Sequence, residues 1–437
     1  MQTQALPGFR DFYPADLAIR DYIFRTWRQV AARYGFEEYD GPPLEPLELY
    51  TAKSGAEIVG QLYSFTDKGG REVSLRPEMT PTLARMVAAR ANGLKKPIRW
   101  FSIPQLFRYE RQQRGRLREH FQLNCDLIGE AGHLADAEIV ALAVDAVRAF
   151  GLGPEDVRVR LSDRRLLTAL LDALGVGEKQ VATVYQVFDK LRRTPEDASV
   201  RRLTEAGLAP AAVDRLLAVA RARNWDDLAR VDPVVAGALD QGDSLRRTLD
   251  ALRAMGFGDH LDLDLAIVRG LAYYTGTVFE LFDARGELRA ICGGGRYDNL
   301  LESLGGVDLP ALGFGMGDVV LGELLRERGL APPAGATVDV FLAAITQDDL
   351  AEVLGLAREL RDAGLRVEYA LAPQAVGKQL KLADARGARL AIVVGPDDRA
   401  RGEVMVKDLR GKGQESVGRG ALREHVEGVV RGTALSP

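Results

Sequence analysis

Alternating polar residues between positions 120 and 126 are the strongest chemical signal in this sequence. If this segment is a strand, successive side chains point to opposite faces. One face is apolar and fits a protein core, with Phe121, Leu123, Cys125 and Leu127. The other face would suit the floor of a site for a small polar ligand, because it carries His120, Gln122, Asn124 and Asp126.

An arginine-rich segment, RYERQQRGRLRE, leads into this strand. Arg108 and Glu110 fall on one face of a preceding strand, and Arg116 falls in the loop between the two strands. Guanidinium groups stay charged and bind phosphate through two hydrogen bonds. The segment therefore suits a triphosphate or an RNA backbone; the alternative is a solvated hairpin tip, as many charge runs are.

Glu78 and Thr80 form a second polar pair, in the segment SLRPEMT. They share a face if the strand expected at Arg71–Leu75 continues through them. A carboxylate beside a hydroxyl would suit an α-ammonium group. The alternative is a helix start, with Thr80 as the cap and Pro81 in the first helical position.

Glycine-rich segments follow later in the chain. The segment IVRGLAYYTGTVFE contains the adjacent Tyr273 and Tyr274, which would face opposite sides of a strand. The run Gly293–Gly295 would let backbone approach a ligand closely, although such runs are more often tight turns. The alternating glycines of Ala311–Asp318 suggest a strand that runs under a flat ring.

Composition narrows the class of protein. A length of 437 residues suggests two to four domains, and a net charge of −4 leaves RNA binding to local basic patches. The two cysteines, Cys125 and Cys292, are not in a CxxC pair, so a disulfide framework or a zinc site is not expected. No run of eighteen apolar residues predicts a membrane span, and the start of the chain lacks a secretory pattern. We therefore expect a cytoplasmic protein with no membrane partner.

The sequence divides into segments of different character. Residues 166–254 are rich in Ala, Leu, Arg and Asp and predict a helical insertion within a first domain of residues 1–328. A Pro/Gly/Ala-rich linker is expected at 329–337. Strands and amphipathic helices then alternate, which predicts a small α/β domain at 338–437 with a largely parallel sheet.

Taken together, these segments resemble the histidyl-tRNA synthetase family over nearly the whole chain. YGFEEYDGP is similar to class II motif 1, FRYERQQRGRLREHFQ to motif 2 and ALGFGMGD to the start of motif 3, while LPGFRDFYP resembles the N-terminal signature. IVRGLAYYTGTVFE and CGGGRYDNLL are similar to the two histidine-specific motifs. The resemblance implies an α+β catalytic domain with an antiparallel class II sheet of six to seven strands and a helical insertion, followed by an α/β anticodon-binding domain.

The resemblance also implies an ATP site. Arg108 and Arg269 are similar to the catalytic arginines at the α-phosphate, and Arg269 would also reach the substrate's carboxylate. Arg116 matches the loop arginine near the γ-phosphate, and Glu110 and His120 would lie in the same ATP site. Mg²⁺ is expected to accompany ATP.

A histidine site is implied beside it. Glu78 and Thr80 match the contacts of the α-amino group, and Gln122 matches the contact of the carboxylate. Asp126 and Tyr274 match the residues that hydrogen-bond the imidazole. Tyr273 and Arg269 are also expected in the histidine site.

The expected activity is that of a histidine–tRNA ligase, which forms histidyl-adenylate and loads tRNA(His). Motif 1, around Glu37–Glu45, implies a homodimer. The alternative is a histidine-binding regulatory subunit of ATP phosphoribosyltransferase, which would lack the anticodon-binding domain and the ATP-binding arginines.

Five positions depart from the family pattern. Asp126 replaces a glutamate, Ala272 replaces the aspartate of RGLDYY, and His120 replaces a phenylalanine that stacks on adenine. Val319 and Val320 replace the Glu-Arg pair of motif 3, so its γ-phosphate arginine is missing.

Overall fold

The computed structural model describes residues 3–51, 59–111, 115–191, 194–268, 274–286, 288–332, 338–411 and 413–432. The chain divides into two compact units, Met1–Pro332 and Pro333–Pro437, and the division falls within the segment 329–337. Each unit has its own sheet and hydrophobic core. None of the helices in the described ranges is long and apolar enough to cross a bilayer.

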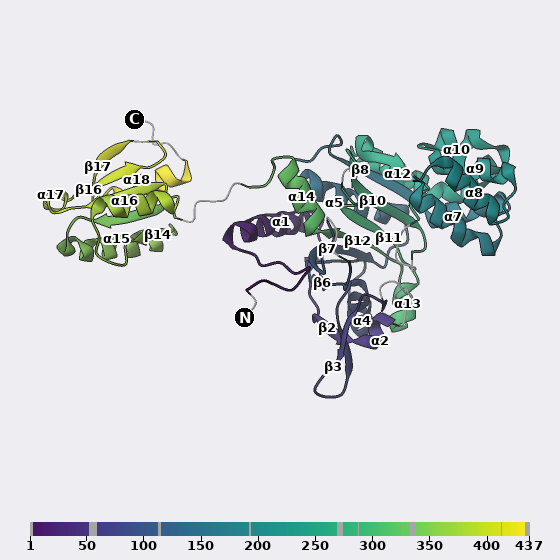
Figure 1. Ribbon diagram of the computed structural model, residues 1–437, viewed down its shortest axis with the longest axis horizontal. Helices are drawn as coiled ribbons and strands as arrows, with labels where there is room; N and C mark the ends of the chain where they lie inside the picture. Colours follow the sequence, from purple (N-terminus) through teal and green to yellow (C-terminus); the bar gives the residue numbers. More distant parts are fainter. Residues whose placement is uncertain are drawn as a thin grey trace. The chain divides into compact units, whose positions relative to one another are not determined.

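A large mixed sheet forms the centre of the first unit (Figure 1). Its strand order is β1-β5-β7-β12-β11-β10-β8-β9, and β6 also pairs with β7, so the described residues contribute nine strands. The bounds are β1 (Glu37–Glu38), β5 (Ile98–Ser102), β6 (Gln105–Phe107), β7 (Glu119–Ile128), β8 (Val157–Asp163), β9 (Leu261–Leu263), β10 (Thr277–Asp283), β11 (Cys292–Arg296) and β12 (Ala311–Gly317).

The antiparallel class II sheet is confirmed for the six strands from β5 to β8, with a difference at the edges. The sheet is larger than the six to seven strands expected, because β1 pairs with β5 and β9 pairs with β8 in parallel. These short edge strands are two and three residues long, too short to give a period-two pattern in the sequence.

Strand β7 separates a core face from a polar face, as its alternation predicts. Leu123, Cys125 and Leu127 are buried in the main core, where α5 (His133–Arg148) supplies many apolar neighbours. Phe121 lies on the same face and meets the rings of Phe12 and Phe24. Helices α1 (Pro14–Arg33) and α12 (Asp243–Ala254) also pack against α5, and α14 (Asp318–Glu327) follows β12.

A small three-stranded sheet of order β2-β4-β3 lies in the same unit. Its elements and the helices beside it are β2 (Leu44–Pro46), β3 (Tyr63–Thr66), β4 (Glu72–Leu75), α2 (Leu47–Thr51), α4 (Thr80–Arg90) and α13 (Leu300–Gly305). Strand β4 ends at Leu75 and α4 begins at Thr80, so the strand does not continue through Glu78. The residue at the helix cap is Met79 and not Thr80, which is already helical, so neither interpretation of this segment was fully right.

The segment after β8 is helical, and Figure 1 shows α7 to α10 gathered as a bundle. The first backbone N–H groups of a helix lack partners within the helix. At the starts of α6, α10 and α11, these groups donate hydrogen bonds to the side chains of Asp163, Asn224 and Asp232, respectively. The bounds are α6 (Arg164–Ala173), α7 (Glu178–Lys190), α8 (Glu196–Glu205), α9 (Pro210–Arg221), α10 (Trp225–Val231) and α11 (Pro233–Ala238).

The second unit has a five-stranded sheet of order β14-β13-β15-β16-β17. The first three of these strands pair in parallel, whereas β16 and β17 are antiparallel, so the sheet is parallel only in part. The bounds are β13 (Val340–Ala344), β14 (Val367–Tyr369), β15 (Leu390–Val394), β16 (Glu403–Asp408), β17 (Gln414–Gly418), α15 (Leu350–Asp362), α16 (Val376–Ala385), α17 (Pro396–Ala400) and α18 (Leu422–Arg431).

Candidate active site

Two adjoining cavities lie over the polar face of the large sheet. One has a volume of about 600 Å³ and the other about 80 Å³. Both are lined by Arg108, Gln122 and Tyr274, so these side chains stand where the two cavities meet. The larger is of a size that holds a nucleotide, and the smaller suits a compact polar group.

Asp126 and Tyr297 form a buried pair at the small cavity. Their side chains belong to β7 and to the residue after β11, and both residues line the cavity wall. The Tyr297 hydroxyl donates a hydrogen bond to Asp126 Oδ1. Burial raises the pKa of the Asp126 carboxyl to about 7, while the bond from Tyr297 acts to lower it. This carboxyl can therefore change its charge near neutral pH.

Two glycines of β12 make space for the polar side chains of β7. A Cβ atom at Gly313 would collide with Asp126 Oδ1, and one at Gly315 would lie 2.6 Å from the Gln122 side-chain Nε2. Gly317, by contrast, has nothing within 4 Å of such an atom. Gly313 and Gly315 thus accommodate side chains of the neighbouring strand, while Gly315 and Gly317 also line the large cavity.

The other residues expected at the histidine site also reach the small cavity. Glu78 and Thr80 line it from the segment that opens α4, and Gln122 lines it from β7. Tyr274 lines both cavities, and burial raises the pKa of its phenol, which therefore stays protonated and able to donate. Tyr273 and Arg269 lie outside the described residues.

The four residues expected at the ATP site line the large cavity together. They are Arg108, Glu110, Arg116 and His120. The Arg108 Nε donates to the carbonyl of Pro77 at 2.9 Å, which holds the guanidinium beside both cavities. Arg116 and Glu110 form an ion pair. Burial, with Arg108, Arg10 and Arg116 nearby, lowers the pKa of His120 to about 3, so its imidazole is neutral.

Arg10 ties the N-terminal segment to the site. Its Nε donates to Glu119 at 2.6 Å and its guanidinium reaches Asp318 at 2.9 Å. Asp318 Oδ1 also accepts the backbone N–H of Phe121 at 2.9 Å. Arg10 therefore links the start of β7 to the start of α14. This role was not predicted from the sequence.

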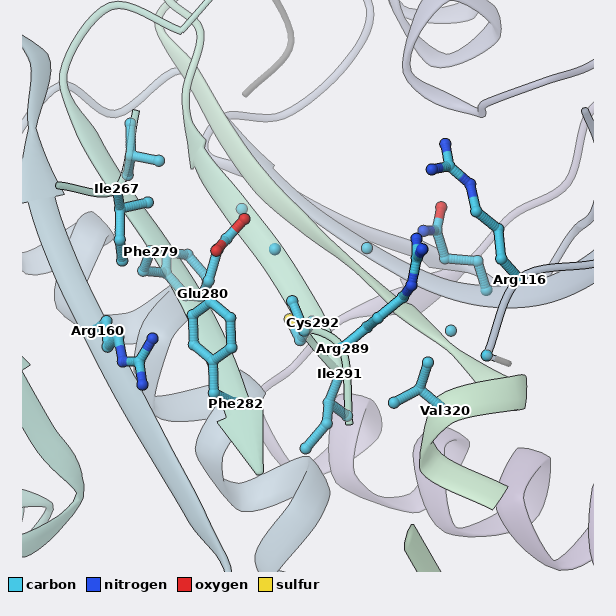
Figure 2. Close-up of a pocket in the computed structure, with 18 of the residues that line it drawn as sticks. Arg116, Arg160, Ile267, Phe279, Glu280, Phe282, Arg289, Ile291, Cys292 and Val320 are labelled. Atoms are coloured by element: carbon cyan, nitrogen blue, oxygen red, sulfur yellow. The ribbon is translucent and has the colours of Figure 1, made fainter. Parts of the chain in front are cut away.

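Further side chains around the large cavity were not expected from the sequence. Figure 2 shows Arg160, Glu280 and Phe282 on one side of it, Arg116 on the other, and Arg289 between them. The Arg160 guanidinium lies over the Phe282 ring at 4.2 Å. These residues come from β8, from β10 and from the segment before β11, so only the pairing of the sheet brings them together.

The arrangement favours chemistry by positioning and charge. Several guanidinium groups line a cavity large enough for a nucleotide, and a carboxyl–phenol pair lies in the adjoining small cavity. The cysteine at the site, Cys292, has its pKa raised by burial and is not activated as a nucleophile. With the antiparallel sheet and a separate α/β unit, this fold and site define a class II aminoacyl-tRNA synthetase.

Comparison with known proteins specifies the family. A family model described as histidyl-tRNA synthetase matches residues 8–318, and one described as anticodon binding domain matches residues 339–428. A histidine–tRNA ligase of Opitutus terrae is 49% identical over 436 residues, which cover 98% of both chains. The chloroplastic/mitochondrial histidine–tRNA ligase of Arabidopsis thaliana is 40% identical over 92% of this chain and 82% of its own length. The chain belongs to the histidyl-tRNA synthetase family.

Solved structures agree with this family in fold. A histidyl-tRNA synthetase from a Nostoc species superposes with a TM-score of 0.85 at 26% identity, covering 98% of this chain and 99% of its own. An ATP phosphoribosyltransferase regulatory subunit/histidyl-tRNA synthetase from Bacillus halodurans has a TM-score of 0.75 at 22% identity and covers 90% of this chain and 98% of its own. At that identity the second likeness speaks only for the fold.

Proposed function

We propose that this chain activates histidine with ATP and transfers the histidyl group to the 3′ end of tRNA(His). The observation that carries the proposal is the pair of adjoining cavities, one with a buried carboxyl–phenol pair and one lined by arginines. They meet at Arg108 and Gln122. Binding two ligands side by side in this way would make the reaction between them effectively unimolecular.

In the first step, a carboxylate oxygen of histidine attacks the α-phosphorus of ATP, and the bond to the bridging oxygen breaks as diphosphate leaves. In the second step, a hydroxyl of the terminal tRNA ribose loses its proton as it attacks the acyl carbon, and the bond from that carbon to the phosphate oxygen breaks as AMP leaves. Negative charge grows on the phosphoryl group in the first transition state, and preorganised cations stabilise it. We assign that work to Arg108 and, by resemblance, to Arg269.

Asp126 is proposed to recognise the imidazole. Tyr297 donates to Oδ1, so we assign the other oxygen, Oδ2, to accept the imidazole N–H. Tyr274 would donate to the second ring nitrogen, and its raised pKa supports this because only the protonated phenol donates. A side chain that lacks such a donor and acceptor would leave these buried groups unpaired, which disfavours other amino acids.

The remaining contacts of the amino acid follow from the same cavity. Glu78 and Thr80 are assigned to the α-ammonium group and Gln122 to the carboxylate, with Tyr273 nearby by resemblance. Glu78 is 3% exposed, and a buried carboxylate is stabilised by a cationic ligand.

The nucleotide is proposed to occupy the large cavity. Arg116 is assigned to the γ-phosphate, and its ion pair with Glu110 supports a fixed position for it. His120 is assigned to the adenine, since a neutral imidazole can stack on a base. Mg²⁺ is expected to arrive with ATP, because it is usually held by substrate phosphates plus one or two carboxylates, and Glu110 and Glu280 line this cavity.

The second unit is proposed to bind the anticodon region of tRNA. Of four basic residues on or near α16, Arg386 pairs with Glu368 at 3.3 Å and Arg389 pairs with Asp408 at 3.1 Å. Lys378 and Lys381 are exposed on the helix and are the better candidates for phosphate contacts. We further expect a cytoplasmic location, which cell fractionation would test.

A homodimer is proposed through the region around motif 1. Two large apolar side chains of the small sheet, Leu44 and Phe65, are 37% and 49% exposed, which supports a covered surface there. Light scattering at micromolar concentration should report twice the mass of 47.7 kDa. A mass of one chain would contradict the dimer.

A regulatory subunit of ATP phosphoribosyltransferase is the rival function. The match of an anticodon-binding model to residues 339–428 favours the ligase, as do Arg108 and Arg116 at the cavity. The test is charging of purified tRNA(His) with labelled histidine by the full chain, with a tRNA of another specificity as control. The proposal expects ATP-dependent charging of tRNA(His) alone, whereas the rival expects histidine binding without charging.

A further inference from the structure

One wall of the large cavity is apolar where helix α14 begins. Val319 and Val320 line the cavity at this point, beside the loop that carries Gly115 and Arg116. A triphosphate bound beside Arg116 would carry several negative charges, and these need more than one cation nearby. At that end of the cavity, the first turn of α14 contributes the uncharged side chains of Val319 and Val320.

Arg289 reaches this place from another part of the sheet. It precedes β11 by three residues and lines the same cavity. A Cβ atom at Gly115 would lie 3.3 Å from Val320 Cγ2 and 4.0 Å from Arg289 Cδ, so the loop, the helix start and the Arg289 side chain converge. Figure 2 shows the Arg289 side chain extended through the cavity toward the side of Arg116, past Val320.

We propose that Arg289 is a nucleotide-binding residue that contacts the β- and γ-phosphates of ATP, at the place where Val319 and Val320 of α14 supply no cation. Within the described residues, three guanidinium groups would then contact the triphosphate from three segments: Arg108 at the α-phosphate, Arg116 from the loop, and Arg289 from before β11. This inference rests on the proposed use of ATP.

The charge of the cavity supports this role. Burial is the main cause of the lowered pKa of His120, and Arg108, Arg10 and Arg116 add to it, so several guanidinium groups lie near this imidazole. The Arg289 guanidinium adds a further cationic group to the lining of the same cavity, where the phosphates of a bound nucleotide could meet it. A guanidinium also offers two parallel donors to phosphate oxygens, which a lysine cannot.

The test compares ligands that contain or lack the outer phosphates. Affinities of ATP–Mg²⁺ and of AMP are measured by calorimetry for the wild type and for Arg289→Met, Arg289→Lys and Arg285→Met. Arg285 is an exposed arginine in the turn after β10 and serves as the matched control. Because AMP lacks the β- and γ-phosphates, a residue that contacts only these should not affect AMP binding.

The proposal expects Arg289→Met to weaken ATP binding tenfold or more with AMP affinity unchanged within twofold, and Arg289→Lys to fall between. Arg285→Met should match the wild type. Equal weakening of ATP and AMP would overturn the proposal, since it would indicate a role in the shape of the cavity; so would unchanged ATP binding.

These titrations need no turnover, so they separate this inference from the proposed function. If the wild-type chain binds ATP but does not charge tRNA, the proposed function fails while the role of Arg289 is still decided by the comparison of ATP with AMP.

Discussion

At the scale of single residues, the ionisation of Asp126 should make the use of histidine depend on pH. Burial raises its pKa from the ordinary value of 3.8 to about 7, and the hydrogen bond from Tyr297 opposes that shift. The charged form is the one that accepts an imidazole N–H. We therefore expect kcat/KM for histidine to rise with pH through about 7 in the wild type.

Replacing Tyr297→Phe should move this rise to higher pH. The substitution removes a donor that favours the carboxylate, so the pKa of Asp126 increases further. Asp126→Asn should remove the rise and lower kcat/KM for histidine about tenfold or more, since leaving a buried polar group with the wrong partner costs about 1–3 kcal/mol. The measurement is ATP–diphosphate exchange at varied histidine between pH 5.5 and 9.

Free histidine itself titrates, but equally for all three proteins, so differences among them report on the enzyme. A Tyr297→Phe profile that coincides with the wild type would show that the hydroxyl does not control Asp126. The KM for ATP serves as an internal control and should stay within about twofold.

Arg269 is assigned by resemblance alone, and a kinetic experiment addresses it. A cation aimed at charge that develops in the transition state affects the rate more than ground-state binding. Arg269→Ala should therefore lower the rate of histidyl-adenylate formation at least a hundredfold, with a much smaller change in histidine affinity. Near wild-type exchange, or a loss of thermal stability in place of activity, would argue for a purely structural arginine.

Gln122 and Asp126 could be predicted from the sequence, whereas Tyr297 could not. Gln122 and Asp126 belong to one strand, so their alternation is visible locally. Tyr297 meets Asp126 across 171 positions, and only the placement of β11 and β12 beside β7 brings the two together. Its segment, CGGGRYDNLL, is similar to a histidine-specific motif, but the sequence alone assigns no contact to the tyrosine.

At the scale of elements, β12 offers a direct test of how glycines shape the site. A methyl group at Gly313 would collide with the Asp126 carboxylate and the carbonyl of Cys125, and the strand backbone cannot easily move away. Gly313→Ala should raise the KM for histidine tenfold or more while the KM for ATP changes little.

Gly317→Ala is the matched control, because nothing lies within 4 Å of the added atom on the same strand. Because Gly317 lines the large cavity, this variant should keep the wild-type KM for histidine, and any loss should fall on the KM for ATP. Similar losses in both variants would mean that β12 tolerates no side chain for reasons unrelated to Asp126.

Elements with a long, regular residue pattern were predicted well from the sequence, whereas short strands that depend on pairing with distant strands were not. Strand β7 followed its apolar and polar alternation, and the segment 166–254 folded as the helices expected. The edge strands β1 and β9 are set by tertiary pairing. At residues 76–80, Pro77 and Pro81 flank the change from strand to helix, and this turn replaced the expected continuation.

At the scale of the whole molecule, the division into two units predicts a division of labour. The residues proposed for adenylate formation all belong to the first unit, which has its own core. A chain that ends at Pro332 should keep histidine-dependent ATP–diphosphate exchange within a few fold and lose at least a hundredfold in kcat/KM for tRNA(His). Exchange and charging measured on the same preparation check this; loss of both together would show that the first unit depends on the second.

The central claim is that the paired cavities accept histidine and ATP and join them. The most direct measurement is ATP–diphosphate exchange by the purified full chain with each of the twenty amino acids in turn. We expect exchange that depends on histidine, with the other nineteen amino acids at least a thousandfold lower in kcat/KM. Exchange with a different amino acid, or histidine binding with no exchange at all, would contradict it.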